Sequence, residues 1–303
     1  MRPDVESAYA HCERIARRHY ENFTIGSCLL PRSERRHLAA LYAFARGADD
    51  IADEPEHAGD RAAALDAWEA ALDDALGGRA SGPVFVAVAH TLEARGLSDE
   101  PLRALLRAFR YDAAFEPFAD FTALRAYCAN SANPVGRLVL GLFGVTDERA
   151  LALSDEVCTG LQLANFWQDL SVDLPRGRSY LPIDEVEACE GAGAALSERT
   201  GNPGFEELLG LQLERARRFL ARGEALAARI PLRAALEVRT FAGGGLRIVG
   251  RVEALGSRVL RVRPRLQRGD YVTVLATSVA RTAAQPFVGA SGGAQRARRK
   301  GVA

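Results

Sequence analysis

Two short acidic segments, each within a stretch of helical periodicity, constrain this chain more than any other feature. They run from Asp49 to Asp53 (DDIAD) and from Asp169 to Asp173 (DLSVD). The outer aspartates of each segment are four residues apart, so both carboxylates project from one face of one helix. Like charges at this spacing destabilise an isolated helix unless a cation neutralises them. Two such pairs therefore predict a cavity with four carboxylates that holds Mg²⁺ against a polyphosphate.

Helical periodicity extends over most of the remaining chain, whereas the alternation typical of strands is almost absent. Residues 259–263 are the best strand candidate, but Pro264 ends that segment at once. No linker or shift in composition separates the two acidic segments. We therefore predict an all-α, single-domain helical bundle over residues 1–284, with helices at 4–20, 33–54, 60–76, 83–95, 99–114, 120–130, 134–143, 147–172, 205–229, 232–241, 245–256 and 269–282.

Composition excludes several classes of protein. The 303 residues carry no net charge, so nucleic acid is not an expected partner. No apolar run of about 18 residues predicts a spanning helix, and the N-terminus lacks the apolar segment of a secretory signal, so a cytoplasmic location is expected. The only lysine is Lys300, so a phosphate-binding or Schiff-base lysine has no candidate. The five cysteines are scattered without zinc-site spacing and are expected to be reduced thiols.

The last residues, 285–303, are rich in Gly, Ala, Ser and basic side chains, and they are predicted to form a disordered tail. The basic residues of this tail would allow contact with an anionic membrane surface: Arg296, Arg298, Arg299 and Lys300. The alternative is that the tail only keeps the chain in solution.

The first acidic segment shares its helix face with two further polar residues. At about 100° per residue, the sector of roughly 60° that holds this stripe contains Tyr42, Arg46, Asp49 and Asp53. A tyrosine, an arginine and two aspartates on one stripe suit the walls of a polar cavity. Taken alone, the stripe is equally compatible with a solvated surface on which Arg46 pairs with an aspartate.

The second acidic segment has the same arrangement on a more apolar helix. One face carries Gln162, Asn165, Asp169 and Asp173, and the flanking residues are apolar. Because so apolar a helix is difficult to place in solvent, the polar stripe is predicted to line an interior cavity. Arginine would give bidentate hydrogen bonds to phosphate oxygens, and Mg²⁺ would stabilise a departing diphosphate. The carbocation left behind needs an aromatic pocket that excludes water.

Four segments carry a family resemblance. They are HYENFTIGSCLLP (19–31), LYAFARGADDIADE (41–54), YCANSANPVGRLVL (127–140) and LQLANFWQDLSVDLPRGRSYLP (161–182). With these segments the chain resembles the squalene/phytoene synthases, the head-to-head branch of the all-α isoprenoid synthases, over roughly residues 5–280. The resemblance implies a helical bundle of the isoprenoid synthase type with a central cavity, and a prenyl diphosphate as the substrate.

The resemblance also implies roles for individual residues. Catalysis and metal binding would belong to the four outer aspartates, supported by Asp50: Asp49, Asp53, Asp169 and Asp173. Contacts to the diphosphate or to the metal shell would come from Arg46, Gln162 and Asn165. The cavity or its polar mouth would be lined by Phe23, Tyr42, Tyr127 and Tyr180. The segment PRGRSYLP, with Arg176 and Arg178, resembles the lid that closes over the diphosphate.

Within the family, the segments HYENF, NSANPVG and NFWQD are similar to the bacterial hydroxysqualene synthases of hopanoid biosynthesis. Relatives commonly carry an arginine before the second aspartate motif, where Gln168 stands here. The loss of that charge suits an enzyme that takes presqualene diphosphate ready-made. The resemblance thus implies an Mg²⁺-dependent carbon–oxygen lyase that converts presqualene diphosphate to hydroxysqualene. Water would capture the carbocation, so no nicotinamide is expected.

The resemblance further implies partnership with a presqualene diphosphate synthase and, because the substrate is oily, peripheral contact with the inner face of the membrane. Two alternatives remain open. One is a squalene or phytoene synthase, a prenyltransferase that joins two prenyl diphosphates head to head. The other is a non-catalytic helical protein that binds lipids or partners. Gly243–Gly245 lacks the spacing of a dinucleotide-binding loop and predicts either a hinge or a close helix contact.

Overall fold

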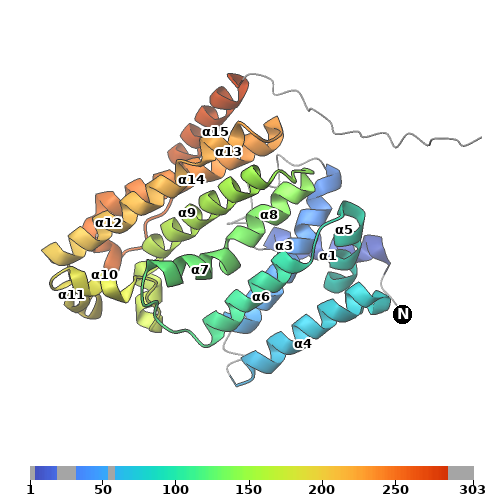
Figure 1. The fold of residues 1–303 in the computed structure, drawn as a ribbon, viewed down its shortest axis with the longest axis horizontal. Coiled ribbons are helices and arrows are strands. Elements are labelled where there is room, and N and C mark those ends of the chain that lie inside the picture. Colours follow the sequence, from blue (N-terminus) through green and yellow to red (C-terminus); the bar gives the residue numbers. More distant parts are fainter. Residues whose placement is uncertain (1–3, 19–31, 54–58, 286–303) are drawn as a thin grey trace, which may run out of the picture.

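The computed structural model describes residues 4–18, 32–53 and 59–285. This part of the chain is built from helices and contains no β-strand, which confirms the predicted all-α class. None of its helices is both long and apolar enough to cross a membrane. Figure 1 shows them in one bundle: α1 (Val5–Arg18), α3 (Arg32–Asp53), α4 (Arg61–Asp74), η2 (Ala75–Arg79), α5 (Pro83–Arg95), α6 (Glu100–Ala113), α7 (Phe121–Ser131), α8 (Asn133–Leu142), α9 (Glu148–Asp173), η3 (Leu174–Arg176), α10 (Ile183–Ala188), α11 (Ala192–Glu198), α12 (Pro203–Leu220), α13 (Gly223–Ala227), α14 (Leu232–Leu255), η4 (Gly256–Leu260) and α15 (Arg268–Ala283).

α9 lies at the centre of the bundle. It packs against α7, α8, α12, α13 and α14, while α1, α3, α5 and α6 form a second group on the other side of α7 and α8 (Figure 1). The Asp147 side chain caps the start of α9 by accepting a hydrogen bond from the Ala150 N–H at 2.8 Å. Near the other end, Leu163, Phe166 and Trp167 are buried and anchor α9 in the largest apolar core. The polar stripe of α9 is therefore held at a fixed rotation.

A tight turn follows the end of α9. Pro175 lies in η3 and has no N–H to continue a helical hydrogen-bond ladder. Gly177 has a φ of 76°, a conformation that favours glycine. The Arg178 N–H then donates to the Asp173 carbonyl oxygen at 3.0 Å. The chain reverses here, so Arg178 can reach α3.

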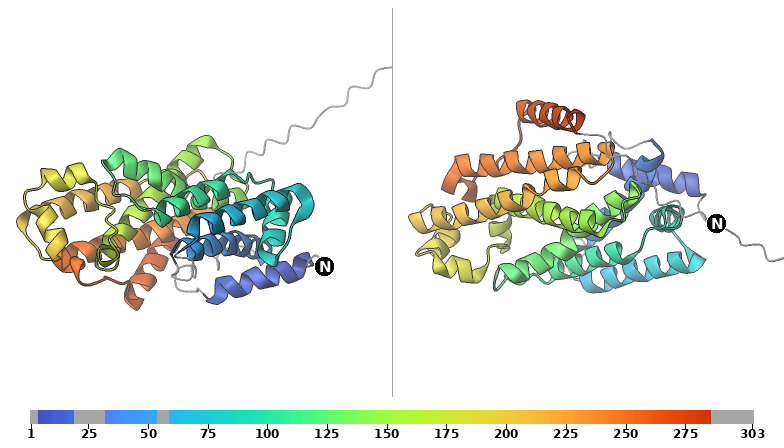
Figure 2. Two further views of the ribbon diagram at one scale, coloured as in Figure 1. Left: turned by 90° about the horizontal axis from the view of Figure 1, so that it is seen from below. Right: turned by 45° about the horizontal axis from the view of Figure 1, so that its top comes forward.

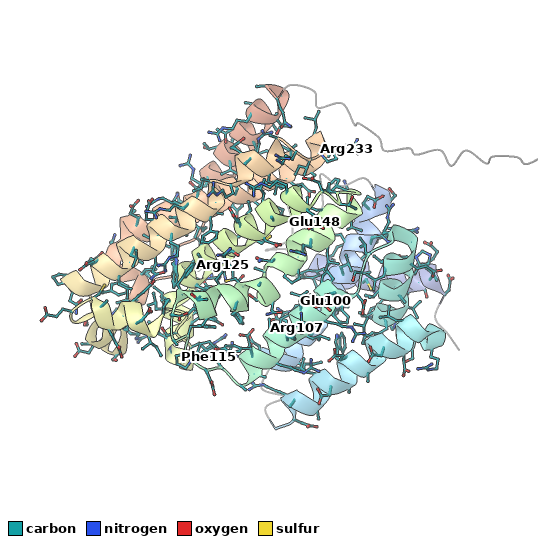
Figure 3. All side chains as sticks on the ribbon, viewed as in Figure 1. Glu100, Arg107, Phe115, Arg125, Glu148 and Arg233 are labelled. Atoms are coloured by element: carbon teal, nitrogen blue, oxygen red, sulfur yellow. The ribbon has the colours of Figure 1, made fainter. Side chains whose placement is uncertain are left out.

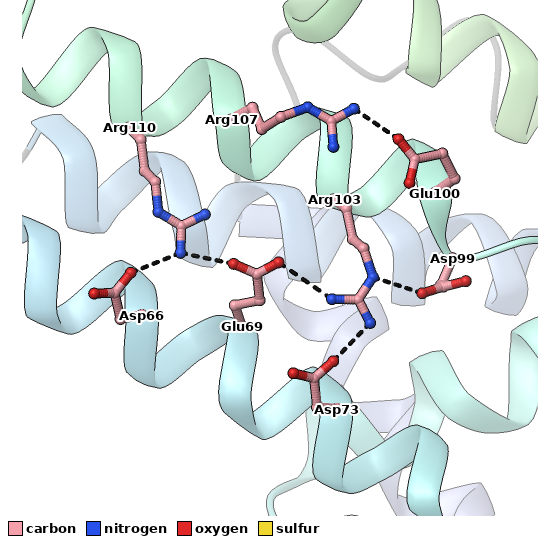
Figure 4. A network of polar contacts seen from close by, with 8 residues as sticks. All are labelled: Asp66, Glu69, Asp73, Asp99, Glu100, Arg103, Arg107 and Arg110. Carbon is pink, nitrogen blue, oxygen red and sulfur yellow. Dashed lines mark hydrogen bonds and ion pairs between the residues drawn. The ribbon is translucent and has the colours of Figure 1, made fainter.

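A network of ion pairs holds α4 against α6 (Figure 4). Arg110 contacts both Asp66 and Glu69, and Arg103 contacts both Glu69 and Asp73. The α4 acids are spaced three and four residues apart, so they share one helix face. Isolated surface pairs of this kind contribute little to stability, but a network in which each arginine contacts two or more carboxylates fixes the relative position of the two helices.

Several predicted boundaries differ from the structure. The predicted helix at 205–229 is two helices, α12 and α13, with a break at residues 221–222. The helices predicted at 232–241 and 245–256 are one continuous helix, α14, that runs through Gly243–Gly245. The hinge alternative is therefore wrong and the close-contact alternative is confirmed, because a Cβ on Gly245 would lie 2.9 Å from a methyl group of Leu161.

Residues 259–263, the segment with the most strand-like pattern in the predicted all-α chain, contain no strand. Val259 and Leu260 are fully buried and belong to the 3₁₀ helix η4, because their side chains fill the core between α9, α12 and α14. Residues 261–263 follow as exposed irregular chain. Two short helices that the pattern did not predict, α10 and α11, lie between α9 and α12.

Gly160 marks the closest approach of α9 to α12. A Cβ at this position would lie 2.9 Å from the backbone nitrogen of Leu220 and 2.9 Å from the Cβ of Phe219. We expect Gly160→Ala to lower the free energy of unfolding by roughly 1–3 kcal/mol, because backbone cannot move aside as a flexible side chain can. Urea denaturation followed by circular dichroism measures this change.

Gly210 on α12 provides the matched control. It is an exposed helical glycine, and a Cβ there would meet nothing within 4 Å. Gly210→Ala should raise the free energy of unfolding by roughly 0.5–1 kcal/mol, since alanine loses less backbone entropy in a helix. Equal stability of the Gly160→Ala variant and the parent protein would show that α12 shifts freely against α9.

Candidate active site

A cavity of about 380 Å³ lies between α3, α6, α7 and α9. It brings the two acidic segments, which are far apart in the sequence, to a common space. Of the predicted site residues, those in its lining are Asp49, Asp53, Tyr127, Gln162, Asn165, Asp169, Asp173, Arg178 and Tyr180. The whole second stripe and the two aspartates of the first therefore face one partly open cavity.

Three predicted site residues are not in this lining. Arg46 lies beside the cavity and forms ion pairs with Asp49 at 3.0 Å and with Asp50 at 2.5 Å. Tyr42 is on the same helix, and burial raises the pKa of its hydroxyl. Phe23 lies outside the described residues.

Each aspartate pair carries one carboxyl group with an elevated pKa. Burial, followed by the negative charge of Asp53, raises the pKa of Asp49 to about 6. Burial, followed by the charge of Asp169, raises the pKa of Asp173 to about 6. Both causes penalise the ionised form, so a cation placed between the members of a pair would be strongly favoured.

Two arginines from other segments reach these pairs. Arg178, after the turn that ends α9, donates from Nη1 to Oδ1 of Asp53 on α3 at 2.9 Å. Arg263, between η4 and α15, makes a bidentate contact with Asp169, from Nε to Oδ1 at 2.5 Å and from Nη2 to Oδ2 at 3.0 Å. Each pair thus has a guanidinium that is also able to bind phosphate oxygens.

Arg263 was not predicted from the sequence, and Gln168 explains its position. The Gln168 side chain donates from Nε2 to the Pro264 carbonyl oxygen at 2.8 Å, which fastens the segment after η4 beside α9. Arg263 thereby contacts the aspartate that immediately follows Gln168. The positive charge that Gln168 lacks is supplied from a distant part of the chain. The local sequence does not predict a role for Arg263 at the cavity, because it is one of several closely spaced arginines, a pattern that is typical of a basic surface.

Asp112 on α6 is a fifth carboxylate in the cavity lining and was not predicted from the sequence. The Tyr127 hydroxyl lies 2.8 and 2.9 Å from its two carboxylate oxygens and donates its hydrogen bond to them. Burial raises the pKa of Asp112 to about 7, although the hydrogen bond from Tyr127 opposes the shift. The nearest acidic residue, Glu116, lies beyond the end of the predicted helix at 99–114, so no pair of carboxylates on one helix face pointed to Asp112 and only the fold reveals it.

An aromatic cluster forms one wall of the cavity. Phe166 and Tyr180 stack with ring centroids 3.9 Å apart and planes 6° apart, and both line the cavity together with Tyr127. Further rings extend the cluster behind them, including Phe118 and Phe115. Of these two, Figure 3 labels Phe115, which lies where the chain leaves α6. Ring faces stabilise positive charge. The cavity therefore has a carboxylate and arginine end beside an aromatic wall.

The donor set fits a metal that is shared with substrate. Among the described residues, no three His, Cys, Asp or Glu side chains come close enough to hold an ion by themselves. Mg²⁺ in proteins commonly takes only one or two carboxylates and completes its octahedron with water and phosphate oxygens. The facing pairs Asp49/Asp53 and Asp169/Asp173, with the amide oxygens of Gln162 and Asn165, are suited to that mode.

The fold is that of the all-α isoprenoid synthases. A family model described as squalene/phytoene synthase matches residues 16–270, and the chain belongs to this family. The crystal structure of a squalene synthase, HpnC from Alicyclobacillus acidocaldarius, has 38% sequence identity and a TM-score of 0.80, over 83% of this chain and 95% of that one. A 15-cis-phytoene synthase from Synechocystis is 27% identical over 73% of this chain and 69% of its own. A dehydrosqualene synthase structure, 21% identical, has a TM-score of 0.83 over 92% of this chain and 98% of that one, a likeness of fold.

Proposed function

We propose that this protein converts presqualene diphosphate to hydroxysqualene and diphosphate in an Mg²⁺-dependent reaction. The observation that carries the proposal is the cavity itself, in which two aspartate pairs with their arginines adjoin an aromatic wall. The carbon–oxygen bond to the diphosphate breaks and its electron pair leaves with the diphosphate. The cyclopropylcarbinyl cation rearranges, and water adds to it and loses a proton. No nicotinamide takes part.

The polar end of the cavity would bind the diphosphate. Asp49, Asp53, Asp169 and Asp173 would hold Mg²⁺, which when bound neutralises the charge that develops on the leaving group. Arg178 and Arg263 turn from these carboxylates to the diphosphate oxygens, to which guanidinium groups bind bidentately. No other basic residue has to move into the cavity, since both arginines already contact the aspartates.

The aromatic wall would stabilise the carbocation. Phe166, Tyr180 and Tyr127 present ring faces to the carbon skeleton and exclude bulk water. The single water that captures the cation must lose a proton, and Asp112 is a carboxylate in hydrogen-bond contact with this wall. With a pKa near neutrality, about 7, Asp112 is suited to accept that proton.

A second candidate function is condensation of two prenyl diphosphates, as in a squalene or phytoene synthase. Two observations favour it: the curated relatives include 15-cis-phytoene synthase, and Arg263 restores a positive charge at the second aspartate pair. In either case we propose a cytoplasmic enzyme that works at the inner face of the membrane, with a prenyl diphosphate as its substrate. For the first function, a presqualene diphosphate synthase would supply that substrate.

One assay separates these functions. Purified protein with Mg²⁺ is given presqualene, farnesyl or geranylgeranyl diphosphate, and the extracted lipids are identified by mass spectrometry. We expect hydroxysqualene from presqualene diphosphate without added nicotinamide, and none after chelation of the metal. Coupled C30 or C40 products from farnesyl or geranylgeranyl diphosphate would instead establish the second candidate. Absence of diphosphate release from all three substrates would refute both.

A further inference from the structure

α15 is the outermost helix of the described bundle, and it packs on α14 (Figure 2). The side that faces the protein is marked by residues four apart, Asp270, Val274 and Ser278, all of which are buried. Arg251 of α14 donates to Asp270 at 2.7 Å and fixes the start of the helix. The rotation of α15 is therefore defined, and its opposite side faces outward.

The polarity of α15 is the reverse of that expected for a helix in water. Two of its three buried residues are polar, whereas its outer side carries Val272, Leu275 and Val279, with Val272 69% exposed and Val279 47% exposed. No charged residue occurs between Asp270 and Arg281. Amphipathic surface helices place their apolar side against the core and their charged side outward. A contiguous outward apolar stripe of this kind marks a contact surface.

Positive charge surrounds the start of this stripe. Residues 256–285 contain six arginines and one aspartate. Arg263 and Arg281 are paired with acidic residues of other segments, and the other four arginines form no ion pair within the described residues. Arg265 and Arg268 form no ion pair with any residue in the described ranges, and Arg261 donates only to a backbone carbonyl, that of Arg199. Arginine at a helix N-terminus is opposed by the helix dipole, so these charges do not serve the stability of α15.

From this arrangement we infer that the outer side of α15 docks on a membrane surface that contains anionic phospholipid. The apolar stripe enters the headgroup boundary and the arginines bind lipid phosphates. Charge complementarity favours lipid over a second copy of the chain, because two copies would bring two strongly basic segments together. For the proposed function, this docking would bring the enzyme to its membrane-dissolved substrate. Binding of α15 to lipid does not itself require that function to be correct.

The position of α15 connects the docking surface to the cavity. Arg263, at the second aspartate pair, is only five residues from Arg268, the first residue of α15. Five residues of extended chain span at most about 18 Å. A docked protein therefore keeps its diphosphate-binding end close to the headgroup layer, where the diphosphate of a membrane-dissolved prenyl substrate lies.

Vesicle sedimentation tests the inference without substrate. The full-length protein is mixed with vesicles of phosphatidylcholine alone or of phosphatidylcholine with phosphatidylglycerol. We expect binding to the anionic vesicles only. Val272→Ser and Val279→Ser should each weaken it about tenfold through lost apolar burial. Arg265→Gln and Arg268→Gln should each weaken it about fivefold, and high salt should reproduce the arginine effect.

Leu76→Ser is the matched control, because Leu76 is 42% exposed in η2, which directly follows α4, and α4 lies far from α15 in Figure 1. It should bind as the parent protein does. Retained binding in the Val272→Ser/Val279→Ser double variant would overturn the inference. So would loss of binding on neutralising only Arg296, Arg298, Arg299 and Lys300, which would assign lipid contact to the terminal segment. Light scattering that shows a dimer abolished by the double variant would mean that a second copy covers α15.

Discussion

Asp49→Asn and Asp169→Asn should each reduce turnover about a thousandfold or more while leaving the helical fold intact. Asparagine keeps the shape of the side chain but removes the charge that would hold Mg²⁺ against the diphosphate. Each aspartate faces the cavity from a different helix, so neither can replace the other. Diphosphate release from presqualene diphosphate measures the rate, and circular dichroism checks the fold.

A binding readout strengthens this test, since it does not depend on turnover. Mg²⁺ with diphosphate should raise the melting temperature of the parent protein and should have little effect on either variant. Asp66→Asn is the control, because Asp66 is an exposed carboxylate on α4 that only contacts Arg110. It should keep the parent rate. A near-normal rate in either cavity variant would refute the assignment of the metal site.

Glu237→Gln is the substitution with the largest expected effect on stability. Glu237 is 3% exposed on α14, and its Oε1 has no hydrogen-bond partner within the described part of the chain. Burial raises the pKa of this carboxyl group from 4.5 to about 8. The folded protein therefore holds a proton that the unfolded chain releases between those values. Stability must fall as the pH rises through that window.

The size of the effect follows from the same shift. At neutral pH the buried carboxyl group costs about 3 kcal/mol relative to a group that never ionises. Glutamine is uncharged at every pH, so the variant should be more stable than the parent by up to about 3 kcal/mol near pH 7 and by little near pH 5. Urea denaturation at the two pH values measures the difference.

Glu224→Gln provides the opposite case. Burial alone would raise the pKa of the Glu224 carboxyl group, but the hydrogen bonds that it accepts from Arg281 and Arg239 together lower it below its usual value. Its stabilising effect is present above the unfolded pKa, so the glutamine variant should be less stable than the parent at neutral pH. If Glu237→Gln left the pH dependence of unfolding unchanged, Glu237 would have to be hydrated or paired in solution.

The parts of the site that could be predicted from the sequence are those with a local pattern. The spacing of Asp49 and Asp53 on one helix, and of Asp169 and Asp173 on another, already determined which side chains would share a face. The apolar neighbours of the second stripe indicated that this face was interior. The structure brings both aspartate pairs to one cavity, because α3 and α9 pack in the same bundle, whereas Tyr42 and Arg46 of the first stripe lie outside its lining.

The parts that could not be predicted depend on packing between distant segments. Asp112 shares its helix face with no second acidic residue, because Glu116 lies beyond the helix end, and Arg263 lies among several arginines of residues 258–268, so the local sequence of neither residue distinguishes it from a surface residue. Gln168 was interpreted as the loss of a charge, whereas its hydrogen bond to Pro264 positions the arginine that replaces that charge. The triple glycine of α14 likewise required the neighbouring Leu161 to decide between a hinge and a contact.

The arginines at the aspartate pairs also bear on how such a cavity can exist before substrate arrives. Three of the four outer aspartates already have a guanidinium counter-ion: Asp49 has Arg46, Asp53 has Arg178 and Asp169 has Arg263. Arginines of the same chain therefore serve as counter-ions to these aspartates. The chain can fold without metal to reduce the repulsion among its carboxylates. In the proposed reaction Mg²⁺ would take the place of the arginines at the aspartate pairs, and the arginines would then be free to bind the phosphate oxygens. The same carboxylates would thus have a counter-ion both before and after substrate arrives.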